Sequence, residues 1–261
     1  MKKIVSFVLA MICLFALAGC GGTQKTEAPA QKPAAAEKVL RVGTDADYPP
    51  FEYYREASKT YTGFDIELMN AVAKGMGYSK VEYVNLEFNN LLPSLNDKQV
   101  DVVISCMGIT EERSKMADFS EPYLDSGFVV VGPADAKAGG LDAIKDKKLT
   151  AEVGTLPAKV AKEYSKDVVE CSGAEEALNL VVNKKADFAI MDNYTAKAYV
   201  SNNFKAKLAI CAEIPDTKDK GIGIAVAKGN KELLDKLNEA LRSYRDSAAF
   251  VQLKKTYFGN L

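Results

Sequence analysis

The stretch LLPSLNDKQVDVVIS, residues 91–105, aligns without a gap with ALNLVVNKKADFAIM, residues 177–191. Each stretch has the pattern of a helix, followed by a polar turn, an aspartate and an apolar strand. Strands that alternate with helices are typical of α/β folds that contain parallel strands. Any α/β unit has this order, so coincidence stays open, but the repeat predicts two lobes built on one plan.

The sequence around each stretch extends this plan. In the first lobe, strands are predicted at 40–45, 81–85 and 100–105, and helices at 63–77 and 88–97. In the second lobe, strands are predicted at 147–154, 167–171 and 186–192, and helices at 155–165 and 174–185, with Thr155 as an N-cap. The predicted fold class is therefore α/β, with a mostly parallel sheet flanked by helices in each lobe.

The C-terminal part predicts one more strand, within 215–230, and helices at 231–246 and 249–259. Because one strand and two helices are too few for a third core, we expect them to return to the first lobe. Lobe 1 then comprises residues 39–126 and 220–261, and lobe 2 comprises residues 127–219. The chain would cross between the lobes near 125–129 and 214–220, and these two crossings are candidates for a hinge.

The N-terminal segment indicates export. Residues 1–19 have a basic start and an apolar run ending in small residues, as in a secretory signal peptide. The run ends in LAGC, which resembles the lipobox of bacterial lipoproteins, so we expect cleavage before Cys20 and acylation of its thiol. An ordinary signal peptide with a chance cysteine is the alternative. Residues 20–38 predict a disordered tether, so the protein would be lipid-anchored to the cell membrane, facing the periplasm or the cell exterior.

Composition excludes several kinds of function. The 34 Lys and Arg residues balance the 35 Asp and Glu residues without a basic run, so nucleic-acid binding is not expected. Histidine is absent, which removes Ser-His-Asp and Cys-His catalysis and most zinc chemistry. No metal and no cofactor are expected. After the N-terminal segment, Cys106, Cys171 and Cys211 leave at least one free thiol or an intermolecular bond.

The stretch SCMGITEER, residues 105–113, follows a predicted strand and has features of an anion site. Thr110 and the two acids after it are typical of a helix start, where backbone N–H groups lack partners. Arg113 adds a fixed cation in the first turn. An anion suits this pair, although Arg113 could instead form a surface salt bridge with a neighbouring glutamate.

Polar and aromatic residues also follow other predicted strands. Ligands of open α/β sheets bind beyond the carboxyl ends of the strands, and near these ends the chain has Asp45, Tyr48, Phe51 and Asp192. Each has a plainer alternative, because the aromatic residues could belong to the core and the aspartates could cap turns or helices. Together they predict a cleft with aromatic walls, one cation and carboxylates. A free α-amino acid has the complementary groups.

The chain also resembles the family 3 extracellular solute-binding proteins, the receptors of polar amino-acid ABC importers. The resemblance rests on GFDIELMNAVAKGM (63–76), DADYPPFEY (45–53), residues 91–123 and VGTLPAKVAKEY (153–164). It extends from Val39 to the C-terminus. It implies a type II periplasmic-binding-protein-like fold, with two α/β lobes joined by two hinge crossings.

The resemblance implies a role for each site residue. Arg113 would hold the ligand carboxylate together with backbone N–H groups around Gly108 and at Thr155 and Leu156. Asp192 would hold the α-ammonium group. The other predicted ligand-binding residues are Asp45, Tyr48, Phe51 and Phe88 at the ligand side chain, and Ser105, Cys106 and Met107 along the same wall.

The chain departs from the family pattern at several of these positions. Gly108 and Leu156 stand where many relatives carry hydroxyl residues that help to hold the carboxylate. Here we expect backbone donors alone, and Pro157 has no N–H. Cys106 stands where relatives carry a small residue, often Gly or Ser. For its thiol we favour a buried, inert role over a redox role.

These observations predict a monomeric receptor, not an enzyme. It would close two lobes around a free polar amino acid and deliver it to an ABC permease with a separate ATPase subunit. Asp45, Asp47 and Glu52 favour a ligand with a cationic or amide side chain. The alternatives are a ligand-sensing lipoprotein for a signalling partner, and an enzyme such as a periplasmic dehydratase on the same fold.

Overall fold

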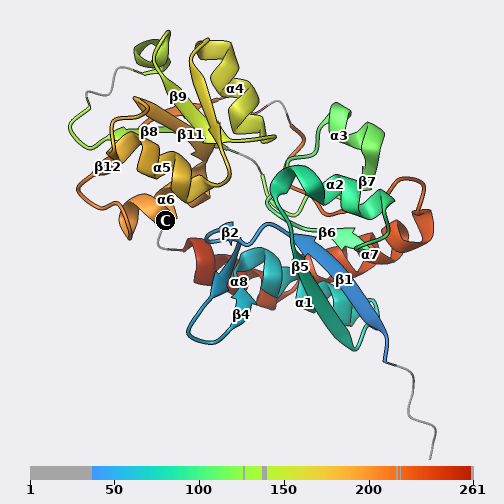
Figure 1. Ribbon diagram of the computed structural model, residues 1–261. Helices are drawn as coiled ribbons and strands as arrows, with labels where there is room; N and C mark the ends of the chain where they lie inside the picture. Colours follow the sequence, from blue (N-terminus) through green and yellow to red (C-terminus); the bar gives the residue numbers. More distant parts are fainter. Residues whose placement is uncertain (1–36, 126, 137–139, 216, 218, 260–261) are drawn as a thin grey trace, which may run out of the picture. The chain divides into compact units, whose positions relative to one another are not determined.

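The computed structural model describes residues 37–125, 127–136, 140–215, 217 and 219–259 (Figure 1). The predicted signal peptide (1–19), the lipidated Cys20 and the tether up to residue 36 lie outside the described residues. The last two residues of the predicted tether are described, and the backbone N–H of Lys38 donates to Ser79 Oγ at 2.9 Å. This bond lies just ahead of the first strand, β1 (Val39–Thr44).

The first sheet has five strands in the order β5–β1–β6–β13–β7. Besides β1, these are β5 (Lys80–Asn85), β6 (Val102–Val103), β13 (Ala225–Ala227) and β7 (Ala117–Phe119). β1 pairs in parallel with β5 and β6, whereas β13 pairs antiparallel with β6 and β7. The C-terminal strand thus returns to the first lobe, as predicted.

The second sheet repeats this arrangement, with the order β10–β9–β11–β8–β12. Its strands are β10 (Val168–Cys171), β9 (Leu149–Glu152), β11 (Phe188–Asp192), β8 (Phe128–Pro133) and β12 (Leu208–Ile214). β9 pairs in parallel with β10 and β11, and β8 pairs antiparallel with β11 and β12. The two-lobed α/β fold is confirmed. Each sheet, however, is half parallel and half antiparallel, because returning strands add antiparallel pairs that the helix–strand repeat does not reveal.

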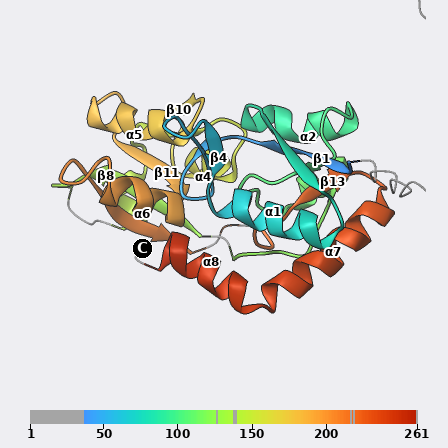
Figure 2. The ribbon, with the colours of Figure 1, turned by 90° about the horizontal axis from the view of Figure 1, so that it is seen from below.

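Helices cover both faces of the first sheet (Figure 2). α1 (Phe64–Gly75), α7 (Lys231–Arg245) and α8 (Ala248–Phe258) pack together over one core, whose buried residues include Leu40, Val42 and Leu237. α2 (Phe88–Asn96) covers a separate core around Leu91 and Val103. A short helix, α3 (Glu111–Met116), follows β6, with Thr110 as its N-cap as predicted.

The second lobe has the same layered plan. Along β8, Val129 and Val131 point into a core under α5 (Ala174–Val182) and α6 (Asn193–Ser201). Phe128 and Val130 point to the opposite core, under α4 (Leu156–Tyr164) and the 3-10 helix η1 (Leu141–Ile144). Successive residues of a strand face opposite sides, so a strand buried on both faces is apolar throughout.

A third, small sheet was not predicted. It contains β2 (Asp47–Tyr48), β3 (Glu52–Arg55) and β4 (Thr60–Thr62), paired antiparallel. Its strands are short and largely polar, so they lack the apolar run or alternation that identifies a strand in a sequence. This sheet is formed by residues that follow β1, and it lies next to the second lobe.

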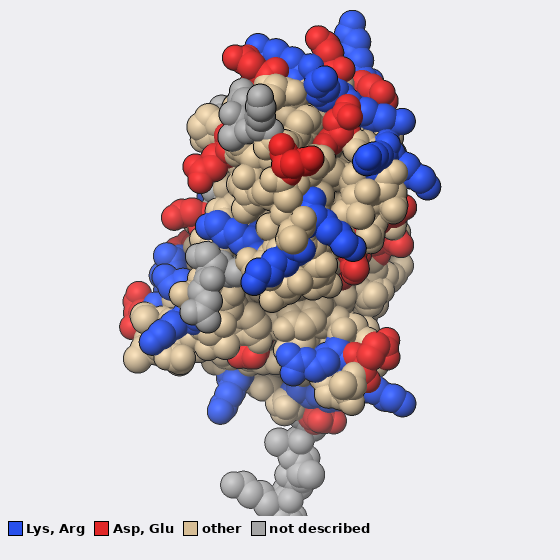
Figure 3. Space-filling view, turned by 90° about the vertical axis from the view of Figure 1, so that its left-hand side faces the viewer, with Lys and Arg blue, Asp and Glu red and all other residues tan. Residues whose placement is uncertain are grey.

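Acidic and basic residues are intermingled on the face of the molecule in Figure 3. Among the helices of the described residues, none is both long and apolar enough to cross a membrane. Cys106, Cys171 and Cys211 are all unpaired thiols.

Two chain segments connect the sheets and pair with each other. The Tyr123 N–H donates to the Ile222 carbonyl at 2.8 Å, and the Ile222 N–H donates to the Leu124 carbonyl at 2.9 Å. The predicted crossing segments, 125–129 and 214–220, include residues 126, 216 and 218, which lie outside the described residues.

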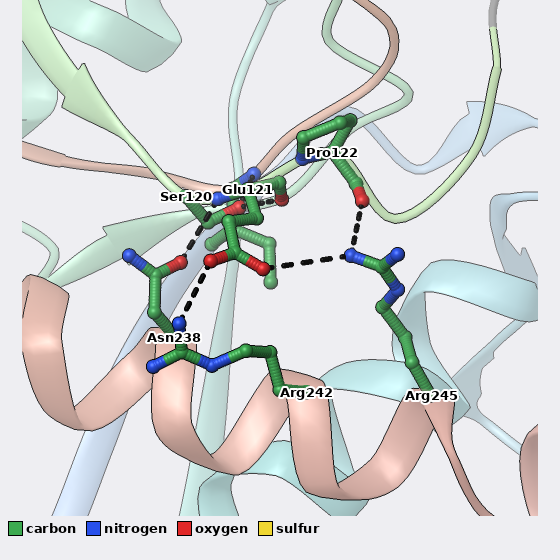
Figure 4. Close-up of polar contacts among 7 residues, drawn as sticks. Ser120, Glu121, Pro122, Asn238, Arg242 and Arg245 are labelled. Atoms are coloured by element: carbon green, nitrogen blue, oxygen red, sulfur yellow. Dashed lines mark hydrogen bonds and ion pairs between the residues drawn. The ribbon is translucent and has the colours of Figure 1, made fainter.

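Helix α7 holds the first of these segments from the side of lobe 1 (Figure 4). Arg242 donates to the Glu121 carboxylate at 2.9 Å, and Arg245 donates to the Pro122 carbonyl at 2.8 Å. Asn238 Oδ1 accepts from the Glu121 N–H at 2.9 Å. The chain is therefore attached to the first lobe up to the point where the two connecting segments meet.

Candidate functional site

A cavity lies between the two lobes, beyond the carboxyl ends of β1, β6, β9 and β11. This is where ligands of α/β sheets bind. Ten of the twelve predicted ligand-binding residues line it: Asp45, Tyr48, Phe88, Ser105, Cys106, Gly108, Arg113, Thr155, Leu156 and Asp192. Residues far apart in the chain are thus brought to one place.

Two predicted residues do not line the cavity. Phe51 is fully buried in the core beneath α1, where its ring lies 6.2 Å from that of Phe64. Met107 is 1% exposed and packs in the core under α2. Met107 follows Cys106 directly, but Cys106 packs against the core under α1. The two neighbouring side chains therefore pack in different cores of the first lobe. For Phe51 the core alternative was the right one.

The cavity is also lined by residues outside the predicted set, namely Glu52, Phe128, Glu152, Pro157, Asp219 and Ile222. Glu152 is the last residue of β9, so the rule that identified Asp45 and Asp192 would have found it. Asp219 and Ile222 lie on the return connection between the lobes. Asp219 lies among the turn residues that open this segment, ahead of the predicted strand, where no periodicity indicates the direction of a side chain.

Arg113 is held at the floor of the cavity by its own lobe and by the opposite one. Its guanidinium donates to the Gly108 carbonyl at 2.9 Å and to the Gly154 carbonyl of the second lobe at 3.3 Å. It also lies over the Phe88 ring, 5.1 Å from its centroid. Burial lowers the pKa of Arg113 to about 10, so the side chain stays cationic near neutral pH. Guanidinium has five N–H donors, and these bonds leave donors for a carboxylate.

A side chain at position 108 would lie too close to neighbouring side chains. A Cβ at this position would lie 2.7 Å from Asp219 Oδ2 and 2.9 Å from Leu156 Cδ1. The Asp219 carboxylate and the Leu156 side chain thus fill the space that a hydroxyl residue would need. Asp219 Oδ2 is buried without a hydrogen bond among the described residues, and the negative charge of Asp219 favours the charged form of Arg113.

The start of α4 faces the same cavity. Thr155 caps the helix, as predicted, by accepting from the Ala158 N–H at 3.2 Å. The Thr155 N–H donates weakly to the Glu152 carbonyl at 3.4 Å, and Pro157 has no N–H. Among the first residues of this helix, Leu156 therefore keeps a backbone donor that a ligand carboxylate can use.

Asp192 combines the two roles considered for it. As the N-cap of α6, its Oδ1 accepts from the backbone of Tyr194 at 2.7 Å and of Thr195 at 3.3 Å. The same carboxylate lines the cavity and is 3% exposed. Its own N–H donates to the Tyr48 hydroxyl at 3.3 Å, which links the lobes. Burial raises the pKa of Asp192 to about 7.

Asp45 and Glu152 face each other from the two lobes. Burial, followed by the charge of Asp47, raises the pKa of Asp45 to about 7. Burial, followed by the charge of Asp45, raises the pKa of Glu152 to about 9. Asp45 Oδ2 is buried and has no hydrogen-bond donor among the described residues. Two facing carboxyl groups with raised pKa values form a site for a cation, whose charge would restore their ionised state.

The sequence profile of the family described as "Bacterial extracellular solute-binding proteins, family 3" matches residues 40–260. The chain belongs to this family.

Similar members of family 3 include binding proteins for basic amino acids. The arginine-binding extracellular protein ArtP of Bacillus subtilis is 32% identical, over 99% of this chain and 98% of ArtP. A probable histidine-binding protein of Neisseria gonorrhoeae is 33% identical, over 99% of this chain and 96% of that protein. The structure of an ancestral arginine-binding protein bound to arginine has a TM-score of 0.79 and 36% identity, covering 85% of this chain and 98% of the ancestral one.

The cysteine in this family 3 site, Cys106, is half-buried. Burial, followed by the charge of Asp192, raises the pKa of Cys106 well above its ordinary value. Thiolates, not thiols, are the reactive form of cysteine, so the thiol is poorly suited to redox chemistry. The described residues contain no cluster of three or more side chains suited to hold a metal ion.

Proposed function

We propose that this chain is the extracytoplasmic receptor of an ABC importer and that its ligand is a free amino acid with a cationic side chain, with arginine as the first candidate. Binding of amino acids in ABC import is the function of its relatives, two of which are named as arginine- or histidine-binding proteins. The similar structures include an arginine-bound protein. These relatives are named as binding proteins, and we propose that this chain binds its ligand without chemical change.

The charge of the cavity carries this proposal. Among the lining residues that the structure describes, Arg113 is the one Lys or Arg. Four lining carboxyl groups, those of Asp45, Glu152, Asp192 and Asp219, are counted as acidic partners for a ligand, whereas that of Glu52 is bonded to Ser105 in the wall. An amino acid with a neutral side chain needs one cation for its carboxylate and one anion for its ammonium group. The surplus of carboxyl groups at the Asp45–Glu152 end fits a second positive charge on the ligand.

In this proposal each end of the ligand meets a group of opposite charge. The α-carboxylate would lie against Arg113 and the Leu156 N–H, and the α-ammonium group against Asp192. The side-chain cation would lie between Asp45 and Glu152. Such charge-assisted bonds contribute about 1.5–3 kcal/mol each.

The wider organisation is part of the same proposal. Residues 39–126 with 220–261 would move as one lobe and residues 127–219 as the other, bending at the two connecting segments. Because Asp45 and Glu152 come from different lobes, a cation between them would favour the closed form. We further propose export, a lipid anchor at Cys20, a monomer, and delivery of the ligand to a permease with its own ATPase.

Calorimetric titration of the purified protein with each of the twenty standard amino acids tests the proposed function. We expect arginine and lysine to bind more tightly than glutamine, and glutamate to bind least, because a second carboxylate would face Asp45 and Glu152. Binding by none of the twenty, or tightest binding of glutamate, would contradict the proposal. Arg113→Ala serves as the control, since it should abolish the binding of every ligand.

A further inference from the structure

A chain of hydrogen bonds runs behind the cavity, from the end of β1 to Glu52. The Asp45 backbone N–H donates to Ser105 Oγ at 3.1 Å, and the Ser105 hydroxyl donates to Glu52 Oε1 at 2.7 Å. Ser105 is 2% exposed and Glu52 is 1% exposed. The Ser105 hydroxyl is therefore engaged within the protein, although the residue lines the cavity.

A second set of bonds ends on Asp65 of α1, which has no solvent exposure. Asp65 Oδ2 accepts from the Cys106 N–H at 2.8 Å and from the Tyr123 hydroxyl at 2.7 Å. Cys106 has a φ of 42°, in the left-handed region that residues other than glycine rarely adopt. The bond to Asp65 thus holds an uncommon backbone conformation in the cavity wall.

The two sets meet at a pair of oxygens that lack donors. Glu52 Oε2 and Asp65 Oδ1 are both buried, and neither has a hydrogen-bond donor among the described residues. The two carboxyl groups lie within hydrogen-bonding reach of each other. Two ionised carboxylates buried side by side would repel each other without compensation. One proton between these two oxygens removes both the repulsion and the unpaired atoms.

The bonding pattern indicates where this proton resides. Asp65 accepts two bonds at Oδ2, and such bonds favour the ionised form. Burial raises the pKa of Asp65 to about 6, against the lowering effect of the Cys106 N–H and the Tyr123 hydroxyl. Burial, followed by the charge of Asp65, raises the pKa of Glu52 well above its usual range. The bonds to Asp65 and these directions favour Glu52 over Asp65 as the protonated member of the pair.

We propose that Glu52 and Asp65 share one proton, carried on Glu52 Oε2, and act as positioning residues that fix the Ser105–Cys106 wall of the ligand site and attach it to Tyr123. Tyr123 lies where the two connecting segments pair. The Glu52–Asp65 pair therefore contacts both the cavity wall and the point where the segments between the lobes meet. Other titratable groups that face the pair are Asp45, Tyr83, Cys106 and Asp192.

Three variants distinguish a shared proton on the Glu52–Asp65 pair from a role of the two residues in packing alone. Glu52→Gln keeps a carbonyl oxygen for Ser105 and supplies an N–H donor to Asp65, so it should imitate the protonated acid. Glu52→Leu removes both functions. Asp65→Asn replaces the carboxylate whose Oδ2 accepts from both the Cys106 N–H and the Tyr123 hydroxyl with a neutral amide. Exposed Glu82→Gln is the matched control, since Glu82 is paired with Lys80 at the surface.

The first readout is arginine affinity by calorimetry, which rests on the proposed function. We expect Glu52→Gln and Glu82→Gln to bind arginine within about threefold of the wild type, and Glu52→Leu and Asp65→Asn to bind at least about tenfold more weakly. Equal losses for Glu52→Gln and Glu52→Leu would overturn the proposal, because an amide would then fail to replace the acid.

The second readout does not depend on the ligand. The infrared difference spectrum of the wild type minus Glu52→Gln at neutral pH should show the carbonyl band of one protonated carboxyl group. A spectrum showing the loss of an ionised carboxylate instead would overturn the proposal. If the wild type bound no amino acid, the proposed function would fail, while this spectrum would still decide whether the pair shares a proton.

Discussion

Glu152 provides the acidic side chain of the second lobe that faces Asp45 of the first. It is 6% exposed, and burial together with Asp45 raises its pKa to about 9. In the ligand-free protein it is therefore mostly protonated near neutral pH, and a cation between the two groups would favour its ionisation. Recognition of the ligand charge thus depends on one residue from each lobe.

Substitution of Glu152 by Gln should weaken arginine binding by about tenfold, because the loss of one charge-assisted hydrogen bond costs about 1.5–3 kcal/mol. Citrulline, in which a neutral group replaces the guanidinium, should bind the variant about as well as the wild type. Calorimetry with both ligands gives the ratio of the affinity for arginine to the affinity for citrulline. An equal loss for both would show that Glu152 has no part in recognising charge, and Glu112→Gln, at the rim of the cleft, should leave the ratio unchanged.

At this scale the sequence predicted most of the candidate site, for a physical reason. Strand ends are visible in a sequence, and side chains at the carboxyl ends of parallel strands converge, which is why Asp45 and Asp192 were found. Ser105, Cys106 and Phe88 came from the family resemblance. Asp219 was missed because it reaches the cavity from a connection without periodicity. The packing of Asp219 against Gly108 is likewise a contact between distant segments.

At the scale of elements, α3 of the first lobe and α4 of the second face each other at the rim of the cleft. Their ends carry Arg113, Thr155 and Leu156, all of which line the cavity. Outside the cavity, Glu112 of α3 and Lys159 of α4 form an ion pair across the lobes, with side chains 69% and 51% exposed. This pair is formed when the lobes are closed, so it contributes to closure without touching the ligand.

Glu112→Gln should weaken arginine binding by no more than about fivefold, because exposed ion pairs contribute little to stability or binding. The effect should shrink as salt is added, since exposed charges are screened. Titrations of Glu112→Gln, Lys159→Gln and the double variant with arginine, at low and high salt, measure how strongly the Glu112–Lys159 pair contributes to binding. A loss greater than tenfold, or one that salt leaves unchanged, would contradict a role limited to this pair.

Helices α1, α2, α4, α5, α7 and α8 and the strands of the parallel pairs could be predicted, because amphipathic periodicity and caps such as Thr155 are local signals. Helix α6 and strands β7, β8 and β12 were not predicted. The antiparallel half of each sheet could not be predicted, since the pairing of β8 with β12 and of β13 with β6 depends on contacts distant in sequence. The length of β6 is a similar case. An apolar run over 100–105 predicted a full strand, but only Val102 and Val103 form the ladder, and the rest of the run leads into the cavity wall.

At the scale of the whole molecule, the two lobes bring together more carboxyl groups than the protein can keep ionised without a ligand. The pKa values of Asp45 and Asp192 are raised to about 7, and that of Glu152 to about 9. A cationic ligand stabilises the ionised forms and so releases protons on binding. Because the ligand-free groups must first lose their protons, affinity for a cation should rise as pH increases through these pKa values.

Calorimetric titration of the wild-type protein with arginine and citrulline, at about pH 6 and about pH 8, tests the proposal of a cation-selective amino-acid receptor most directly. Arginine should bind at least about tenfold more tightly than citrulline at the higher pH. Its advantage should shrink at the lower pH, because Asp45 becomes protonated and the release of the proton from Glu152 becomes more costly. Equal affinities at both pH values, or an arginine preference that grows as the pH falls, would contradict the account.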